Sequence, residues 1–122
     1  MKSRPEPAAR SPIFELADLD QDMRQEDAYA RDGHTARTLV REPDLRVVFV
    51  TMRAGARLAE HRAKDTAAIH ALSGHVRLQL PDGVVDLPAG RLLVLERGVH
   101  HDVEAVEESS FLITLAWPGS SR

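Results

Sequence analysis

The sequence contains no cysteine, few aromatic residues and no long apolar run. The absence of cysteine excludes a disulfide framework and a thiolate zinc site, so any metal would have to be bound by histidine, aspartate or glutamate. No apolar stretch approaches the roughly 20 residues that span a bilayer, and no apolar leader follows the basic residues of the amino terminus. We therefore predict a soluble, cytoplasmic protein without a membrane partner.

The sequence also lacks a cluster of basic residues. It has 16 lysines and arginines against 19 aspartates and glutamates, and its net charge is −3. Because nucleic-acid binding needs a concentrated basic surface, and base stacking needs aromatic side chains, we predict no nucleic-acid partner. A glycine-rich phosphate loop and a nucleophile spaced for an activating base are missing too, which disfavours those enzyme classes.

A chain of 122 residues is long enough for one domain with a single core. Residues 1–12 are rich in proline and basic residues, which predicts a disordered tail. Residues 13–34 space their apolar side chains at helical intervals and end at Gly33, so we predict one short amphipathic helix. Asp18 or Asp20 is the predicted N-cap of this helix.

From residue 35 to residue 118, short runs of valine, leucine and isoleucine alternate with turn residues every eight to twelve positions. This spacing is typical of an all-β sandwich or barrel. Turn-forming residues occupy positions 42–44, 81–83 and 88–90, and the second of these turns predicts a hairpin. The segment "HVRLQL" at 75–80 alternates apolar and polar residues, as a strand with one buried face does.

The segment "LRVVFVTM" at residues 45–52 is apolar at both strand parities. Both of its faces must therefore be covered, either by the amino-terminal helix or by a second subunit. In so small a protein we favour the subunit, and so we predict a homodimer.

Two segments punctuated by glycine carry a family resemblance. The first runs from Gly55 to Gly74 and begins "GARLAEH", and the second is "DLPAGRLLVLERGVHHDVEA" at 86–105. Together they resemble the two motifs of the cupin superfamily, in particular its small single-domain members of the RmlC-like, cupin_2 type. The resemblance implies a double-stranded β-helix, or jelly-roll barrel, at 35–118.

In cupins, two histidines and a glutamate of the first motif and one histidine of the second bind a metal ion. His61 matches the first of these histidines and His101 matches the last. Ala63 stands where the second histidine is expected, and Ala67 stands where the glutamate is expected. The resemblance therefore implies an incomplete metal site, with two of four ligands retained.

A third ligand would have to come from a residue outside the motif positions. Three protein ligands are the usual minimum for a catalytic ion. Asp65 has the strand parity of His61, His70 reaches the interior only if a bulge intervenes, and His100 alternates with His101. A bound iron, manganese, nickel or zinc ion would need one of these three side chains.

Two functions remain open. In the first, the protein holds a small organic molecule in the barrel, and alanines near the ligand positions leave room for it. The predicted pocket residues are His61, Ala63, Ala67, His70 and His101. In the second, it is a metal-dependent enzyme of the dioxygenase or isomerase type that uses His61, His101 and a non-standard third ligand. We favour the first.

Overall fold

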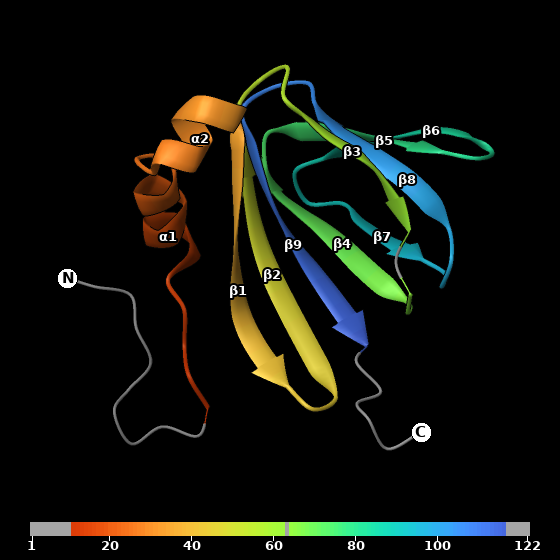
Figure 1. The fold of residues 1–122 in the computed structure, drawn as a ribbon, viewed down its shortest axis with the longest axis horizontal. Helices are drawn as coiled ribbons and strands as arrows, with labels where there is room; N and C mark the ends of the chain where they lie inside the picture. The colour runs from red at the N-terminus through yellow and green to blue at the C-terminus, as the bar shows by residue number, and fades with distance from the viewer. Residues whose placement is uncertain (1–10, 63, 117–122) are drawn as a thin grey trace.

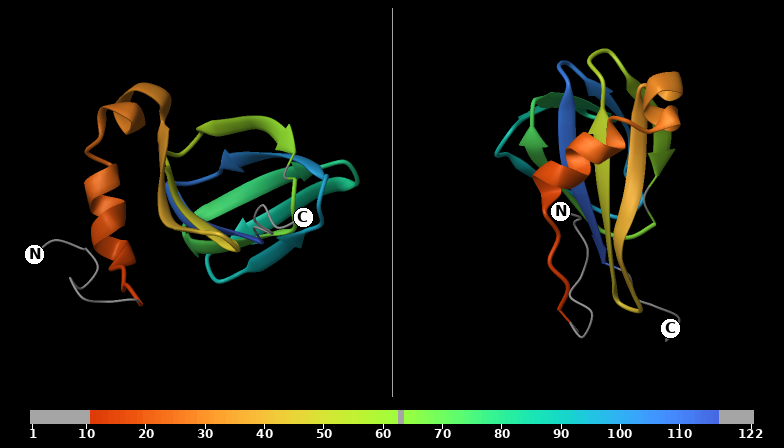
Figure 2. Two further views of the ribbon diagram at one scale, coloured as in Figure 1. Left: turned by 60° about the horizontal axis from the view of Figure 1, so that its bottom comes forward. Right: turned by 90° about the vertical axis from the view of Figure 1, so that its left-hand side faces the viewer.

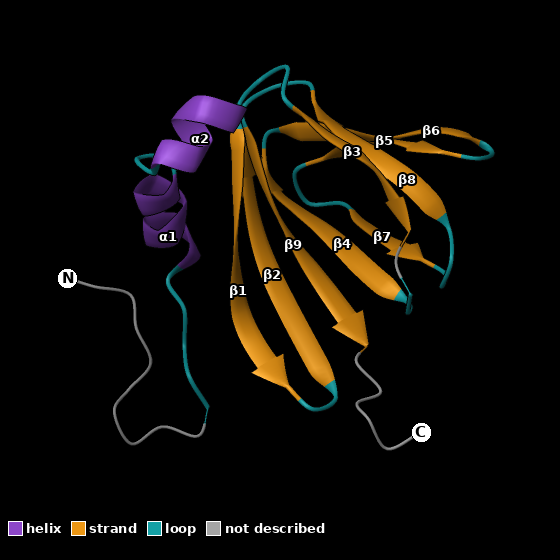
Figure 3. Ribbon diagram, in the orientation of Figure 1, coloured by secondary structure: helices purple, strands orange, loops and turns teal. Residues whose placement is uncertain are grey.

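The computed structural model describes residues 11–62 and 64–116 of the chain. Within that part, two short helices precede nine strands (Figure 1, Figure 3). The helices are α1 (Leu16–Met23) and α2 (Asp27–Asp32). The strands are β1 (His34–Glu42), β2 (Leu45–Met52), β3 (Arg57–Arg62), β4 (Ala67–Ser73), β5 (His75–Leu80), β6 (Gly83–Pro88), β7 (Leu92–Leu95), β8 (His100–Ala105) and β9 (Ser109–Ala116). Most of the predicted disordered tail lies outside the described residues.

The strands form two antiparallel sheets that curve around a shared interior (Figure 2). The larger sheet has the order β1-β2-β9-β4-β7, and the smaller sheet has the order β3-β8-β5-β6. Strands far apart in the sequence pair with each other, as β2 does with β9 and β3 does with β8. This arrangement confirms the predicted all-β jelly-roll barrel with a short helical segment before it.

Two turns show why the sequence folds in this way. Leu80 pairs with Gly83 across a two-residue loop, which confirms the predicted hairpin between β5 and β6. Gly74, between β4 and β5, has a φ of 75°, and a Cβ atom there would lie 2.1 Å from the carbonyl oxygen of Glu108. Only glycine fits this position, because it has both the required backbone freedom and no side chain. The turn after β4 can therefore pack against the turn before β9.

The amino-terminal helices lie against the outer face of the larger sheet, away from the barrel interior (Figure 2). Leu19 and Met23 of α1 pack on Phe49, and all three side chains are buried. Within the part of the chain that the structure describes, no helix is long and apolar enough to cross a membrane.

The helical segment differs from the prediction in two respects. It contains two helices, since the chain turns after Met23, and Glu15 rather than an aspartate occupies the N-cap of α1, with no side-chain cap bond. At the break, the Glu26 carboxylate accepts hydrogen bonds from the Thr35 hydroxyl and the Arg37 guanidinium, which hold this part of the chain against β1. Gly33 ends α2 in the left-handed conformation, as predicted.

The helix also explains why β2 is apolar on both faces. Val50 faces the interior, and the neighbouring Phe49 faces outward and lies beneath α1. Of the two covers that the sequence allowed, the helix is therefore the one present at Phe49, and a second subunit is not needed there. The homodimer stays a prediction, and a monomer in light scattering at micromolar concentration would refute it.

Candidate ligand site at the open end of the barrel

The burial of the inward-facing side chains changes along the barrel. On β9, Phe111 is 0% exposed, whereas Ile113, the next inward residue, is only half-buried. On β2, Val50 is buried, whereas Val48 and Arg46 are half-buried. Because these residues share one face of the sheet, the inward side chains of β2 and β9 are less buried toward one end of the barrel than toward the other.

We name the two ends of the barrel by this difference in burial. The closed end is the interior around Met52, Val50, Ala71 and Phe111. The open end is the interior around Arg46, Ala67, His101 and Leu115. The open end lies where β3 ends and where β4 and β8 begin, toward the lower right of the barrel in Figure 1.

His101 lies on β8 at the open end and is 5% exposed. Its Nδ1 atom is 3.1 Å from the carbonyl oxygen of Val99. Since a carbonyl oxygen only accepts, this hydrogen bond places a proton on Nδ1. Nε2 is then the nitrogen whose lone pair can accept a proton or bind a metal ion.

The strand register brings the backbones of the two retained motif histidines together. His61 on β3 is the Cα partner of His101 on β8, although the two lie forty positions apart in the sequence. A register shift between Leu58 and His61 produces this pairing. The backbones of these two residues are therefore neighbours across the smaller sheet.

The structure describes only one of the two alanines that replace ligands in the first motif. Ala67 begins β4, is 4% exposed and pairs with Leu95 and Leu115, so it faces the interior at the open end. Ala63 lies outside the described residues. At position 67 the chain thus offers a methyl group where the resemblance implied a carboxylate.

His70 does not reach the barrel interior, in contrast to the predicted pocket role. It is exposed, while Ile69 and Ala71 on either side of it are buried in the core. The one register irregularity between β4 and β9 falls between Ala71 and Ser73, after His70, so it leaves the outward parity of His70 unchanged.

The other two predicted third ligands, His100 and Asp65, lie in different places. His100 is exposed and pairs with Arg62, and it points to the opposite side of β8 from His101. Asp65 is half-buried in the bend between β3 and β4, and so it lies at the rim of the open end.

The described side chains do not complete the metal site that the resemblance implies to be incomplete. Among residues 11–59 and 64–116, whose side chains the structure describes, no three histidine, aspartate or glutamate side chains are grouped closely enough to hold an ion. Position 67 can supply no oxygen or nitrogen, and His70 and His100 face outward.

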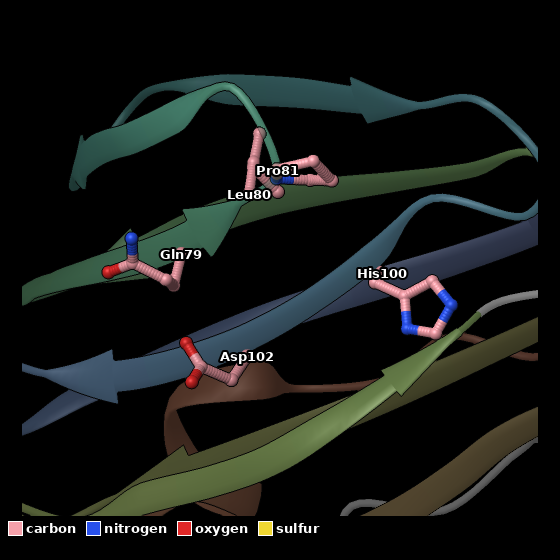
Figure 4. A pocket seen from close by; sticks show the side chains of 5 residues that line it. All are labelled: Gln79, Leu80, Pro81, His100 and Asp102. Atoms are coloured by element: carbon pink, nitrogen blue, oxygen red, sulfur yellow. The ribbon is translucent and has the colours of Figure 1, made fainter.

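A separate groove of about 430 Å³ lies beside β5 and β8 (Figure 4). Gln79 and Asp102, which pair across these strands, have the outward parity, so the groove is not the interior around His101. Arg57 occupies one side of Asp102 through an ion pair of 2.8 Å. The groove is lined by Gln79, Leu80, Pro81, His100 and Asp102.

Sequence reasoning missed Arg46. It has the same strand parity as Val48, Val50 and Met52, all of which face the interior, and its Nε atom is shielded from solvent. The signal was present, because an arginine in phase with three inward apolar residues must begin on the inner face. The surrounding apolar run hid it.

No protein-family model matches the sequence, and no curated protein sequence matches it. Solved structures do resemble the chain. A conserved protein of unknown function from Streptococcus pyogenes superposes with a TM-score of 0.73 at 22% identity, covering 98% of both chains. A cupin superfamily protein from Desulfitobacterium hafniense has a TM-score of 0.72 at 14% identity and covers 95% of this chain and 98% of its own.

Salicylate 1,2-dioxygenase from Pseudoaminobacter salicylatoxidans, solved with gentisate adducts, resembles the chain with a TM-score of 0.77 at 18% identity. The match covers 93% of this chain but only 38% of the dioxygenase. At such low identities these likenesses show a shared fold and nothing of a shared activity.

Proposed function

We propose that this protein, whose chain has the double-stranded β-helix fold of the small cupins, binds a small organic molecule at the open end of its barrel, beside His61 and His101. The observation that carries the proposal is the loss of burial along the interior. Inward apolar side chains such as Val48 and Ile113 are half-buried, which supports entry of a ligand at this end.

The composition of the open end supports binding of an organic molecule. Small-molecule sites have mostly apolar walls and a few polar groups that fix orientation. Here the walls are aliphatic, and His101 is held in one orientation by its hydrogen bond to the Val99 carbonyl. Ala67 takes up little space on the inner face of β4, which favours an organic occupant over a ligated ion.

The alternative function is a metal-dependent enzyme of the dioxygenase or isomerase type. One observation favours it, because a metal-binding histidine commonly donates its second ring N–H to a carbonyl, as His101 does to Val99. Its third ligand would be Asp65 at the rim. We favour this function less, because Ala67 cannot replace the expected carboxylate.

Elemental analysis of protein purified without an affinity tag separates the two functions. We expect substoichiometric metal, together with an organic compound that mass spectrometry detects after denaturation. The compound should be depleted in His101→Ala and retained in His70→Ala, since His70 faces outward and serves as the matched control. Near-stoichiometric iron, manganese, nickel or zinc that disappears in both His61→Ala and His101→Ala would overturn the proposal.

A further inference from the structure

We propose that the protein forms a two-fold homodimer through the outer face of its larger sheet, in which β7 of each protomer docks into a cleft beside α1 of the other. Two side chains of β7 carry the proposal, because Leu92 is 61% exposed and Val94 is 58% exposed. This surface lies outside the barrel, so the dimer does not depend on a ligand at the open end.

Leu92 and Val94 belong to a continuous apolar patch. Val94 pairs with Ala68 on β4, Ala68 pairs with Thr114 on β9, and Thr114 pairs with Val47 on β2. Val47 and Ala68 are half-buried and belong to neither of the two buried clusters of the core. Contiguous apolar patches mark interaction surfaces, whereas single exposed apolar residues are ordinary. The outer apolar patch consists of Leu45, Val47, Ala68, Leu92 and Val94.

The outer face of the larger sheet is uncharged over four of its strands. The outward positions of β2, β4, β7 and β9, all within the described part of the chain, hold no lysine, arginine, aspartate or glutamate, and His70 is the one titratable residue among them. The outer face of the smaller sheet differs, because Arg57 pairs there with Asp102 and Arg77 with Asp86. A two-fold axis places a surface against itself, so a charged surface would meet its own charges. The uncharged face avoids that repulsion.

A cleft of about 250 Å³ opens on the same outer face, between α1 and the larger sheet. Leu16, Ala17 and Leu72 contribute its apolar walls. Its polar groups already have partners, since the two serine hydroxyls that line it bond to each other and Asp20 accepts a hydrogen bond from Thr51. A cavity of about 150 Å³ admits a benzene-sized group. The cleft therefore has room for an apolar side chain.

The cleft and β7 lie on one face, with β4 between them. Leu72 of β4 lines the cleft, and Leu92 of β7 pairs with His70, two positions before Leu72. α1 crosses the part of this face nearer the closed end (Figure 2). In a two-fold contact each protomer gives what it receives, so β7 of each copy can enter the cleft of the other while the apolar patches cover one another. A second copy therefore supplies both halves of this contact.

The oligomeric state of the full chain tests the proposal. We expect light scattering and sedimentation to show a dimer at micromolar concentration. Val94→Glu should raise the dissociation constant of the dimer by about a hundredfold or more, because it would bury an unpaired carboxylate in the contact. Leu92→Glu should act in the same way. Val84→Glu is the matched control, since Val84 is a 50% exposed strand valine on the outer face of the smaller sheet, and it should dimerise like the wild type.

A second variant tests the cleft without adding a charge. Ala17→Trp should fill the mouth of the cleft and weaken the dimer by about tenfold or more. Ala30→Trp is its control, because Ala30 is exposed on α2 and does not line the cleft. Thermal melting checks that each variant is folded.

A wild-type protein that is monomeric at micromolar concentration would overturn the proposal and leave this face to a different partner. A dimer that survives in both Val94→Glu and Leu92→Glu would place the contact elsewhere and overturn it too. A dimer that is unaffected by Ala17→Trp would overturn the docking of β7 into the cleft. None of these outcomes changes the expectation for a ligand at the open end.

Discussion

The two ends of the barrel interior are formed by the same strands but differ in how far their side chains are buried. At the closed end, the side chains of Phe111, Met52 and Val50 are at most 3% exposed. At the open end, the corresponding inward positions on the same strands are Leu115 and Arg46, and both are half-buried. The difference teaches that burial, and with it the contribution of apolar packing to stability, is unequal along the axis of the barrel.

The closed end is also the place where the helices are attached. The Glu108 carboxylate, in the turn before β9, accepts a hydrogen bond from the Tyr29 hydroxyl of α2 and forms an ion pair with Arg24. Arg24 bonds in turn to Asp20 of α1. Apolar packing and polar tethers thus coincide at the closed end.

The largest expected effect is the loss of a closed-end core residue. Phe111→Ala should lower the free energy of unfolding by about 3–5 kcal/mol, because it removes a fully buried ring and leaves a cavity. Ile113→Ala, at the next inward position toward the open end, should cost clearly less, since solvent already reaches that side chain. Denaturant unfolding measures both, and equal costs would contradict the division between the ends.

An intermediate effect is expected when alanines on the inner face of β4 are enlarged. Ala71→Leu overpacks the closed end and should cost about 1–3 kcal/mol. Ala67→Leu should cost less, because its longer side chain can extend into the open end, and it should remove ligand binding. Thermal melts combined with mass spectrometry of the released compound measure the pair. If Ala67→Leu keeps the compound, the ligand is bound elsewhere.

The smallest expected effect is a pH dependence at the helix tether. The Arg24 guanidinium, helped by the Tyr29 hydroxyl, holds the pKa of Glu108 below its ordinary value. A carboxyl with a lowered pKa in the folded state contributes stability that is complete above the unfolded pKa of about 4.3 and is lost as the pH falls through the folded pKa. Because this carboxylate is 56% exposed, solvent screening should limit the contribution to under about 1 kcal/mol.

Glu108→Gln should therefore be less stable than the wild type at neutral pH and equally stable below about pH 3. Glu107→Gln, in the same turn and exposed, is the control and should not change the profile. A deficit in Glu108→Gln that persists in acid would show that its cause is packing rather than charge.

Most of the fold follows from local signals in the sequence. The alternation in 75–80 and the Pro81-Asp82-Gly83 turn define a hairpin that needs no knowledge of the rest of the chain. The break between the two helices could not be predicted in this way. It depends on the Glu26 carboxylate binding Thr35 and Arg37 of β1, which are tertiary contacts.

The site was predicted only in part, and strand parity explains why. Parity predicted that His100 alternates with His101, and the structure agrees. Whether His70 faces inward or outward depended on where β4 has a bulge. The position of a bulge is determined by the pairing with β9 rather than by the residues around His70. The inward position of Arg46 was missed because the apolar run around it hid the alternation of the strand.

The central proposal is that the open end of the barrel binds a small organic molecule beside His61 and His101. An experimental electron-density map of untagged protein tests it most directly. The account predicts an organic molecule in the interior, in contact with His101. A metal ion ligated by His61, His101 and Asp65 would contradict it.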